Sequence, residues 1–375
     1  MTDQNADQPL KKQVSVWDLP VRIFHISLII VVLALLTTGF FAPAWWFSIH
    51  ELLGYALVGL MSFRIVWAWV GSEYSRFNRL KLSIKSLRSW FSKMLNSESV
   101  DDIGHNPPGS WMIITFFILL IIMILTGYFI QGSENLTGLT TVITRYSHSV
   151  ILVWLHKVTA WILLIAIALH VFSVILHDVI LKHALIKSMI TGYKQVPGNT
   201  PPLTRPKPFG IFWALAVALS ITLFIANTHT ENSDRWYDIS LSKQYDTYAN
   251  ECSDCHFLYH PSLNTKRQWS AMLSSLENHY GEDASLSPES LEHLIKFFND
   301  NNQSHFDTRI SVEIGQSESS SGRITDRKFW TETHSNLDDS LFKTPPVYSP
   351  ANCDACHLDA ESGLFRDQNI VLPNT

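Results

Sequence analysis

Apolar residues dominate roughly the first 230 of the 375 residues, and polar and acidic residues dominate the remainder. Five apolar stretches approach the roughly 20 residues that a helix needs to cross the hydrocarbon core of a membrane. They cover residues 23–41, 52–70, 111–130, 151–176 and 209–226. The first follows 22 mostly polar residues and lacks a small-residue cleavage site, which favours a membrane span over a signal peptide. The pattern predicts an all-α fold: a four-helix transmembrane bundle, a fifth transmembrane helix and a small, mainly helical domain.

Basic residues are concentrated in alternate connections between these spans. Residues 71–107 contain six Lys/Arg, residues 178–208 contain five and the N-terminal tail contains three, whereas the other two connections contain only Arg145. Since short cytoplasmic loops carry the excess of Lys and Arg, the N-terminus is predicted to be cytoplasmic. Five crossings then place the C-terminal region in the periplasm of a bacterial cell with this chain in its inner membrane.

We expect four segments in chain order: a membrane domain at 1–195, a Pro-rich linker at 196–208, the fifth transmembrane helix at 209–228 and a periplasmic domain at 229–375. The linker contains five prolines and should be extended and stiff. In the outer domain, residues 264–280 and 288–300 are predicted helices, the second starting near Ser285 or Ser287. The Ser-rich residues 304–325 are predicted to form a loop.

The outer domain is acidic, with 11 Lys/Arg and 23 Asp/Glu and thus a formal charge of −12. This charge favours a basic partner and speeds its encounter at low salt, although it also suits a merely soluble surface. The chain has no nucleotide-binding fingerprint, no Ser/His/Asp signature and no basic patch for nucleic acid. We therefore assign no catalytic residue and expect no nucleic-acid partner.

Two Cys-x-x-Cys-His segments in the outer domain use all four cysteines of the chain: Cys252, Cys255 and His256 form one, and Cys353, Cys356 and His357 form the other. This pattern is typical of c-type haem attachment, in which both thiols add to the haem vinyl groups and the histidine binds the iron. A lone CxxC also suits a redox dithiol or half a zinc site. The histidine after both copies and the predicted periplasmic location favour two covalently attached c haems.

Four histidines in the first, second and fourth spans lie at matching depths. His156 and His170 are 14 residues apart, which in a helix is about 21 Å of rise and close to four turns. Their rings therefore face the same way, one near each membrane surface. Depth pairs His50 with His156 on the outer side and His25 with His170 on the inner side. Ionisable groups inside a span are functional suspects, and these pairs predict two b haems, each bound by two histidines.

Arg64 follows His50 by 14 residues, so it lies on the same helix face at the inner level. A buried arginine requires an anion, and a propionate of the inner haem is the natural one. The alternative is that the long side chain reaches the cytoplasmic membrane surface.

The composition limits which residues can be the second iron ligands of the c haems. Met272 is the only methionine after residue 189, so at most one c haem has His/Met ligation. The other histidines of the outer domain are His229, His260, His279, His293, His305 and His334. We favour His279, at the end of a predicted helix, and His334, which follows Phe329 and Trp330. The sequence leaves open which of the two serves which CxxCH site. Bis-His ligation would give lower potentials than His/Met ligation.

Several segments of the membrane part resemble the prokaryotic cytochrome b561 family, which includes cytochrome b subunits of nickel–iron hydrogenases. They are VWDLPVRIFH at 16–25, HELLG at 50–54, Arg64 with Trp67 and Trp69, YSRF at 74–77 and GHNP at 104–107. The likeness covers about residues 13–195. It implies a four-helix bundle with two b haems, each with two histidine ligands, and electron exchange with membrane quinone. The fifth span departs from that pattern and is expected to act only as a tether.

The C-terminal part, about 245–375, resembles the dihaem cytochrome c family. The segments that carry the likeness are HYGEDASL at 279–286, GRIT at 322–325 and ANCDACH at 351–357. In that family both haems are expected to have two histidine ligands.

The leading interpretation is a membrane electron-transfer protein that passes electrons from quinol through two b and two c haems to a soluble periplasmic acceptor. The alternative is reversed flow, in which a periplasmic dehydrogenase or hydrogenase delivers electrons to quinone. A haem-based sensor or docking module is a third reading, which the lack of an output domain disfavours. The sequence does not fix the direction of flow, the quinone site or the partner.

Overall fold

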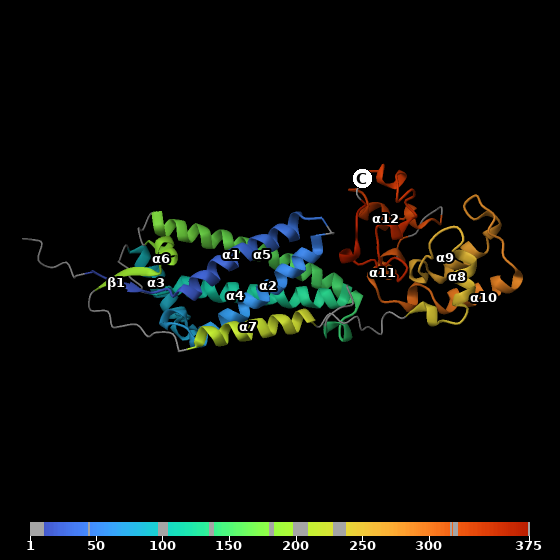
Figure 1. Cartoon of the computed structure of the whole chain (residues 1–375). Helices are drawn as coiled ribbons and strands as arrows, with labels where there is room; N and C mark the ends of the chain where they lie inside the picture. Colours follow the sequence, from blue (N-terminus) through green and yellow to red (C-terminus); the bar gives the residue numbers. More distant parts are fainter. Residues whose placement is uncertain are drawn as a thin grey trace, which may run out of the picture. The chain divides into compact units, whose positions relative to one another are not determined.

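The computed structural model describes residues 11–43, 46–96, 104–134, 139–179, 184–197, 209–227, 238–315, 317 and 322–373. It forms two compact units, and Figure 1 shows their elements in chain order. The first comprises Met1–Ala42, Ile49–Gly127 and Trp154–Asn227, and the second comprises Pro43–Ser48, Tyr128–Val153 and Thr228–Thr375. The described part is mainly helical and contains one two-stranded sheet, which confirms the predicted all-α class.

In the described part of the chain, five helices are long and apolar enough to cross a membrane, as the hydrophobic pattern predicted. They are α1 (Leu19–Phe41), α2 (Phe47–Val70), α4 (Pro107–Glu134), α5 (Tyr146–Val179) and α7 (Gly210–Asn227). Most begin a turn before the predicted apolar stretch, because helix starts carry polar caps. At α1, the Asp18 side chain accepts a 2.9 Å hydrogen bond from the Val21 amide, and Pro20 occupies the first turn.

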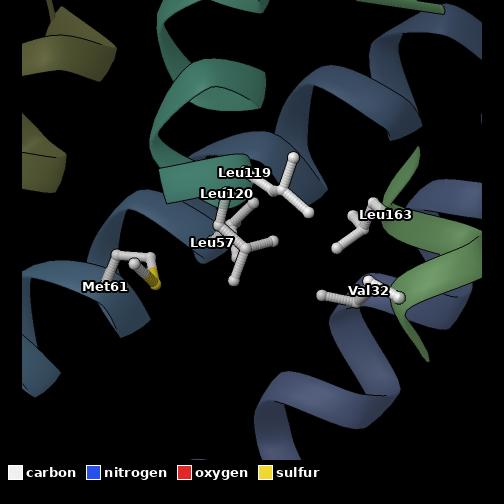
Figure 2. Packing of buried hydrophobic residues seen from close by; sticks show 7 residues of the cluster. Val32, Leu57, Met61, Leu119, Leu120 and Leu163 are labelled. Carbon is white, nitrogen blue, oxygen red and sulfur yellow. The ribbon is translucent and has the colours of Figure 1, made fainter. Parts of the chain in front are cut away.

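Four of these helices meet in one apolar core within the first unit (Figure 2). The buried side chains are Val32 of α1, Leu57 and Met61 of α2, Leu119 and Leu120 of α4, and Leu163 and Ala166 of α5. Each helix thus turns an apolar stripe toward the same interior, which is the arrangement of a four-helix bundle.

The fifth span, α7, packs against the bundle as well as extending the chain. Its Ala214 and Ala218 are buried in a cluster with Phe63 and Trp67 of α2 and residues of α1. A Cβ atom at Gly59 of α2 would lie 2.9 Å from the Thr222 hydroxyl of α7. Small residues on both helices allow this approach, so α7 has a packing role that the sequence analysis, which made it only a tether, did not anticipate. Residues 198–208, most of the predicted linker, lie outside the described residues.

A short sheet and two further helices complete the first unit. Strand β1 (Lys11–Ser15) pairs antiparallel with β2 (Tyr193–Pro197), from Lys11 opposite Pro197 to Ser15 opposite Tyr193. Helices α3 (Ile84–Leu95) and α6 (Leu185–Thr191) lie in the connections rich in Lys and Arg. Residues 11–15 are part of a tail in the sequence prediction, because nothing local indicates a partner 178–186 residues away.

Among its described residues, the second unit contains five short α-helices around a mostly aromatic core. They are α8 (Tyr245–Cys252), α9 (Lys266–Leu273), α10 (Pro288–Asp300), α11 (Arg309–Gly315) and α12 (Lys328–Thr333). Buried core residues are Tyr248, Trp269, Leu273, Leu294, Phe297 and Phe298. The Trp269 and Phe298 rings stack with centres 4.0 Å apart, which joins α9 to α10.

The predicted helix at 288–300 is confirmed, with Ser287 as its N-cap. The other predicted helix, at 264–280, is shorter: α9 begins after a capping box at Thr265 and ends at Leu273. The predicted loop at 304–325 was wrong in part, because α11 lies inside it. Ile310 and Ile314, four residues apart, bury one face of α11 against Leu263 despite the Ser-rich surroundings.

Arg327 joins α12 to the segment before α9. Its side chain is fully buried, and it donates hydrogen bonds to the Leu263 carbonyl at 2.8 Å and to the Asn264 side chain. Arg327 is also the N-cap residue of α12, the helix that leads into His334. The position of His334 therefore depends on this buried guanidinium.

Replacing Arg327 with Met should destabilise the C-terminal domain by about 2–3 kcal/mol, because buried acceptors lose a charged donor. The measurement is a urea titration of the full-length protein followed by c-haem absorbance. Lys328→Met is the matched control, since its ion pair with Glu332 is exposed and should contribute little. Equal midpoints for the two variants would contradict the anchoring role of Arg327.

Candidate haem sites

His50 of α2 and His156 of α5 face each other in the first unit. Their ring centres are 6.3 Å apart and their planes differ by 71°. A metal bound between two imidazoles separates the ring centres by about 6 Å, because each metal–nitrogen bond is about 2 Å and each nitrogen lies about 1 Å from its ring centre. The pair therefore has the separation that one bis-imidazole iron requires.

His25 of α1 and His170 of α5 form the second intramembrane pair, and they lie close enough to interact electrostatically. The His170 ring meets Phe116 of α4 edge-on, with centres 5.6 Å apart. Helix α5 thus supplies one histidine to each pair, and the two are separated by about 21 Å of helical rise. The role of all four residues as haem ligands stays a prediction.

Arg64 is a buried cation with an unsatisfied donor. Its side chain is 5% exposed, and its guanidinium lies 5.2 Å from the Phe77 ring centre and 5.9 Å from that of Phe117. Within the described residues, one terminal nitrogen has no hydrogen-bond partner. This burial argues against the alternative that Arg64 reaches the membrane surface. An orphaned donor on a buried cation fits an anionic group such as a haem propionate.

In the second unit, His256 of the first CxxCH segment faces His279, with ring centres 6.3 Å apart. A tight turn holds His279, because its amide donates to the Glu282 carbonyl at 2.7 Å and Gly281 adopts a φ of 111° that favours glycine. Arg323 lies over the Tyr280 ring at 4.4 Å. Two segments that carry the dihaem resemblance, 279–286 and 322–325, therefore meet at this site.

His357 of the second CxxCH segment faces His334, with ring centres 6.2 Å apart. The Nδ1 atom of His334 lies 2.8 Å from the Trp330 carbonyl, to which it donates, so Nε2 is the nitrogen left for a metal. The Trp330 ring stacks on His334 at 4.4 Å. A cavity of about 370 Å³ opens here, lined by Trp330, His334, Phe342 and Lys343 among others.

Tyr259 connects the two CxxCH segments. Its ring centre lies 4.9 Å from that of His256, and its hydroxyl donates a 2.8 Å hydrogen bond to the Ala351 carbonyl, two residues before Cys353. The two c-haem sites are therefore adjacent in the fold. Tyr259 is not recognisable from the sequence, because a tyrosine three residues after a CxxCH segment carries no signal by itself.

Burial sets the protonation of these groups. It lowers the pKa of His279, His334 and His357, which keeps the imidazoles neutral at neutral pH, the form that binds metals. Burial also raises the pKa of Cys252 to about 11 and that of Cys353 to about 12. A redox dithiol requires a lowered thiol pKa, so this environment disfavours that reading of the CxxC segments.

The other candidate histidines of the outer domain have different surroundings. His260 is 1% exposed, with Nδ1 2.8 Å from the Ser262 hydroxyl and its ring 4.7 Å from Phe306. Burial lowers the pKa of His260 to about 3. His293 and His305 are exposed, and His229 lies outside the described residues.

Comparison with known proteins agrees with this division of the chain. Residues 16–192 match the family Prokaryotic cytochrome b561, and residues 248–365 match the family Dihaem cytochrome c. The protein is thus a membrane-bound electron carrier of the cytochrome class, with haem b in its first part and haem c in its second. Its first region belongs to the prokaryotic cytochrome b561 family, and its second region belongs to the dihaem cytochrome c family.

Relatives of the membrane region include the probable Ni/Fe-hydrogenase B-type cytochrome subunit of Cupriavidus necator, 27% identical over 52% of this chain and 92% of the relative. The probable Ni/Fe-hydrogenase 1 B-type cytochrome subunit of Escherichia coli K12 is 24% identical over 48% of this chain and 89% of its own.

Solved structures resemble the C-terminal region. A diheme cytochrome type c from Shewanella baltica OS155 is 25% identical and covers 36% of this chain and 96% of its own, with a TM-score of 0.29. The diheme cytochrome c from Rhodobacter sphaeroides is 30% identical over 32% of this chain and 94% of its own, with a TM-score of 0.28.

Alanine replacement of either member of a membrane pair should remove one b-haem spectral component and leave the other. We expect His50→Ala and His156→Ala to remove the same component, and His25→Ala and His170→Ala to remove the second. Low-temperature absorption spectra of the purified protein give the readout. His148→Ala, at an exposed histidine at the start of α5, is the control. Loss of one shared component in His50→Ala and His170→Ala would refute the pairing.

Replacing His279 or His334 with methionine should raise the reduction potential of one c haem, because His/Met ligation favours ferrous iron more than bis-His ligation does. His279→Met should affect the haem attached through Cys252 and Cys255, and His334→Met the other. Redox titration with retained covalent haem gives the readout, and exposed His293→Met is the control. Unchanged potentials in both variants would return His260, His293 or His305 to consideration.

Proposed function

We propose that the protein carries electrons from quinol in the membrane to an acceptor in the periplasm through two b haems and two c haems. The observation that carries this proposal is that histidines from distant parts of the chain lie opposite each other in pairs. Three such pairs have ring centres 6.2–6.3 Å apart, and a fourth, His25 with His170, lies in electrostatic range. Bound haem supplies the one-electron chemistry, whereas the protein supplies ligands, spacing and a low dielectric.

Within the bundle, the two histidine pairs would lie at two different depths of the bilayer. His25 and His170 would bind the inner haem. Arg64, one terminal nitrogen of which has no hydrogen-bond partner among the described residues, would pair with its propionate. His50 and His156 would bind the outer haem. The roughly 21 Å of rise between the two histidines of α5 covers most of the approximately 30 Å hydrocarbon core. The pairs therefore provide redox sites near both membrane surfaces.

Beyond the bundle, His256 with His279 and His334 with His357 would bind the two c haems. The adjacency of the CxxCH segments through Tyr259 supports transfer between them. The Lys/Arg bias of the loops supports a cytoplasmic N-terminus and a periplasmic c domain. Fusion of the two domains makes their electron exchange intramolecular and raises their effective concentration. The acidic C-terminal domain suits a basic acceptor protein.

A second candidate function reverses the flow. The relatives of the membrane region are named as hydrogenase B-type cytochrome subunits, which supports a role in delivering electrons from a periplasmic oxidoreductase to quinone. The two directions differ in the order of events. Quinol added to the oxidised protein reduces the b haems before the c haems in the first case. A reductant acting at the periplasmic domain reduces the c haems first in the second.

His156→Ala should abolish reduction of the c haems by quinol, because in the proposed topology the outer b haem is on the periplasmic side of the membrane, the side proposed for the c domain. Dithionite, which does not need the relay, should still reduce them. The measurement is stopped-flow absorbance of both haem types, with His148→Ala as control and a pyridine haemochrome assay to establish equal b and c content in the parent protein. Normal quinol reduction of the c haems in His156→Ala would refute the relay.

A further inference from the structure

Each histidine of the outer pair is contacted by a Thr-Gly dipeptide. Thr38-Gly39 of α1 lies against His50, and Thr126-Gly127 of α4 lies against His156. The Thr38 hydroxyl oxygen is 2.8 Å from Nδ1 of His50, and the Thr126 hydroxyl oxygen is 2.7 Å from Nδ1 of His156. Two different helices therefore present an identical contact to the two rings.

The direction of these hydrogen bonds follows from the carbonyls that lie beside each hydroxyl. The Thr38 hydroxyl donates its own proton to the Ala34 carbonyl at 2.9 Å, and the Thr126 hydroxyl donates to the Ile122 carbonyl at 2.7 Å. A hydroxyl has one proton, so each oxygen accepts from the Nδ1–H of its histidine. The other ring nitrogen, Nε2, is then unprotonated and available to bind a metal.

The glycines provide room for the rings. A Cβ atom at Gly39 would lie 3.3 Å from Cε1 of His50, and one at Gly127 would lie 3.5 Å from Cε1 of His156. The first distance is tighter than an ordinary van der Waals contact, and the second lies within the ordinary range. Each threonine thus orients a ring, and the glycine that follows it lies at the ring edge, most closely at His50.

We propose that the two Thr-Gly dipeptides position the ligands of the outer b haem and lower its reduction potential. The inference rests on the proposed ligation by His50 and His156. A histidine that donates Nδ1–H to an oxygen becomes a more basic ligand through its other nitrogen. A more basic ligand stabilises ferric iron over ferrous iron, so the potential falls. The four residues are positioning residues that act through the histidines.

The test replaces Thr38 and Thr126 with Val, which keeps the shape of the side chain and removes the acceptor. Redox titration of the full-length protein should show the outer b haem shifted toward ferrous iron by about fivefold for each hydroxyl. At 59 mV per tenfold change, this shift is about 40 mV. The inner b haem serves as an internal reference.

Matched variants separate this effect from general disturbance of the helices. Thr37→Val removes an exposed hydroxyl that bonds to the Leu33 carbonyl at 2.8 Å, and it should leave all potentials unchanged. Thr38→Ser and Thr126→Ser retain the acceptor and should restore the parent potential. Gly39→Ala should reduce the content of outer b haem, whereas Gly54→Ala, with open space around its Cβ, should not.

The outcomes distinguish this inference from the function on which it rests. An unchanged or lowered outer-haem potential in both Val variants, with that haem still lost in His50→Ala and His156→Ala, would overturn the inference and leave the proposed function standing. Retention of both b haems in the His→Ala variants would overturn the ligation and the inference together. A raised potential that Ser restores, with the inner haem unaffected, would establish the positioning role.

Discussion

The rest of the structure depends on one constraint: pairs of imidazole rings face each other at the separation that a single metal ion bound between them requires. The outer membrane pair and both pairs of the C-terminal domain keep their ring centres 6.2–6.3 Å apart, although their planes cross at angles from 34° to 77°. Withdrawing imidazole rings from water has a desolvation cost, so the partly buried histidines of these three pairs are unfavourable for the empty chain. Binding of the cofactor removes that cost, which couples haem content to the stability of the fold.

In the membrane bundle, a seven-residue spacing on the helices keeps the two histidine levels apart. Leu163 of α5 is seven residues from both His156 and His170, and Leu57 of α2 is seven residues from both His50 and Arg64. Both leucines belong to the core shared by the four helices. Seven residues are about two turns, so the apolar layer lies on the same faces as the histidines and about 10 Å from each level. The layer closes the bundle where no haem is expected to separate the helices.

The sequence predicted those features that depend on short local patterns of residues. Hydropathy specified the five spans, the CxxCH segments specified two attachment sites, and the 14-residue spacing on one helix suggested the levels of the membrane histidines. The assignment of His279 to one c site and His334 to the other was beyond it, because each depends on a turn or a buried anchor formed by distant residues such as Arg327. The pairing of β1 with β2 and the helix inside the Ser-rich region were missed for the same reason. Both are stabilised by contacts remote in sequence.

The two domains orient their histidines by the same rule with different acceptors. His334 follows the end of α12 and donates Nδ1–H to the Trp330 carbonyl, which also accepts a hydrogen bond from the His334 amide. The histidines of the outer membrane pair lie inside long helices, and each has its acceptor on a neighbouring helix. A threonine hydroxyl bonded back to its own helix supplies an acceptor there at no loss of backbone hydrogen bonding, as Thr38 and Thr126 do. The group that accepts the histidine Nδ1–H therefore depends on the local backbone. It is a carbonyl at a helix end and a hydroxyl within a span.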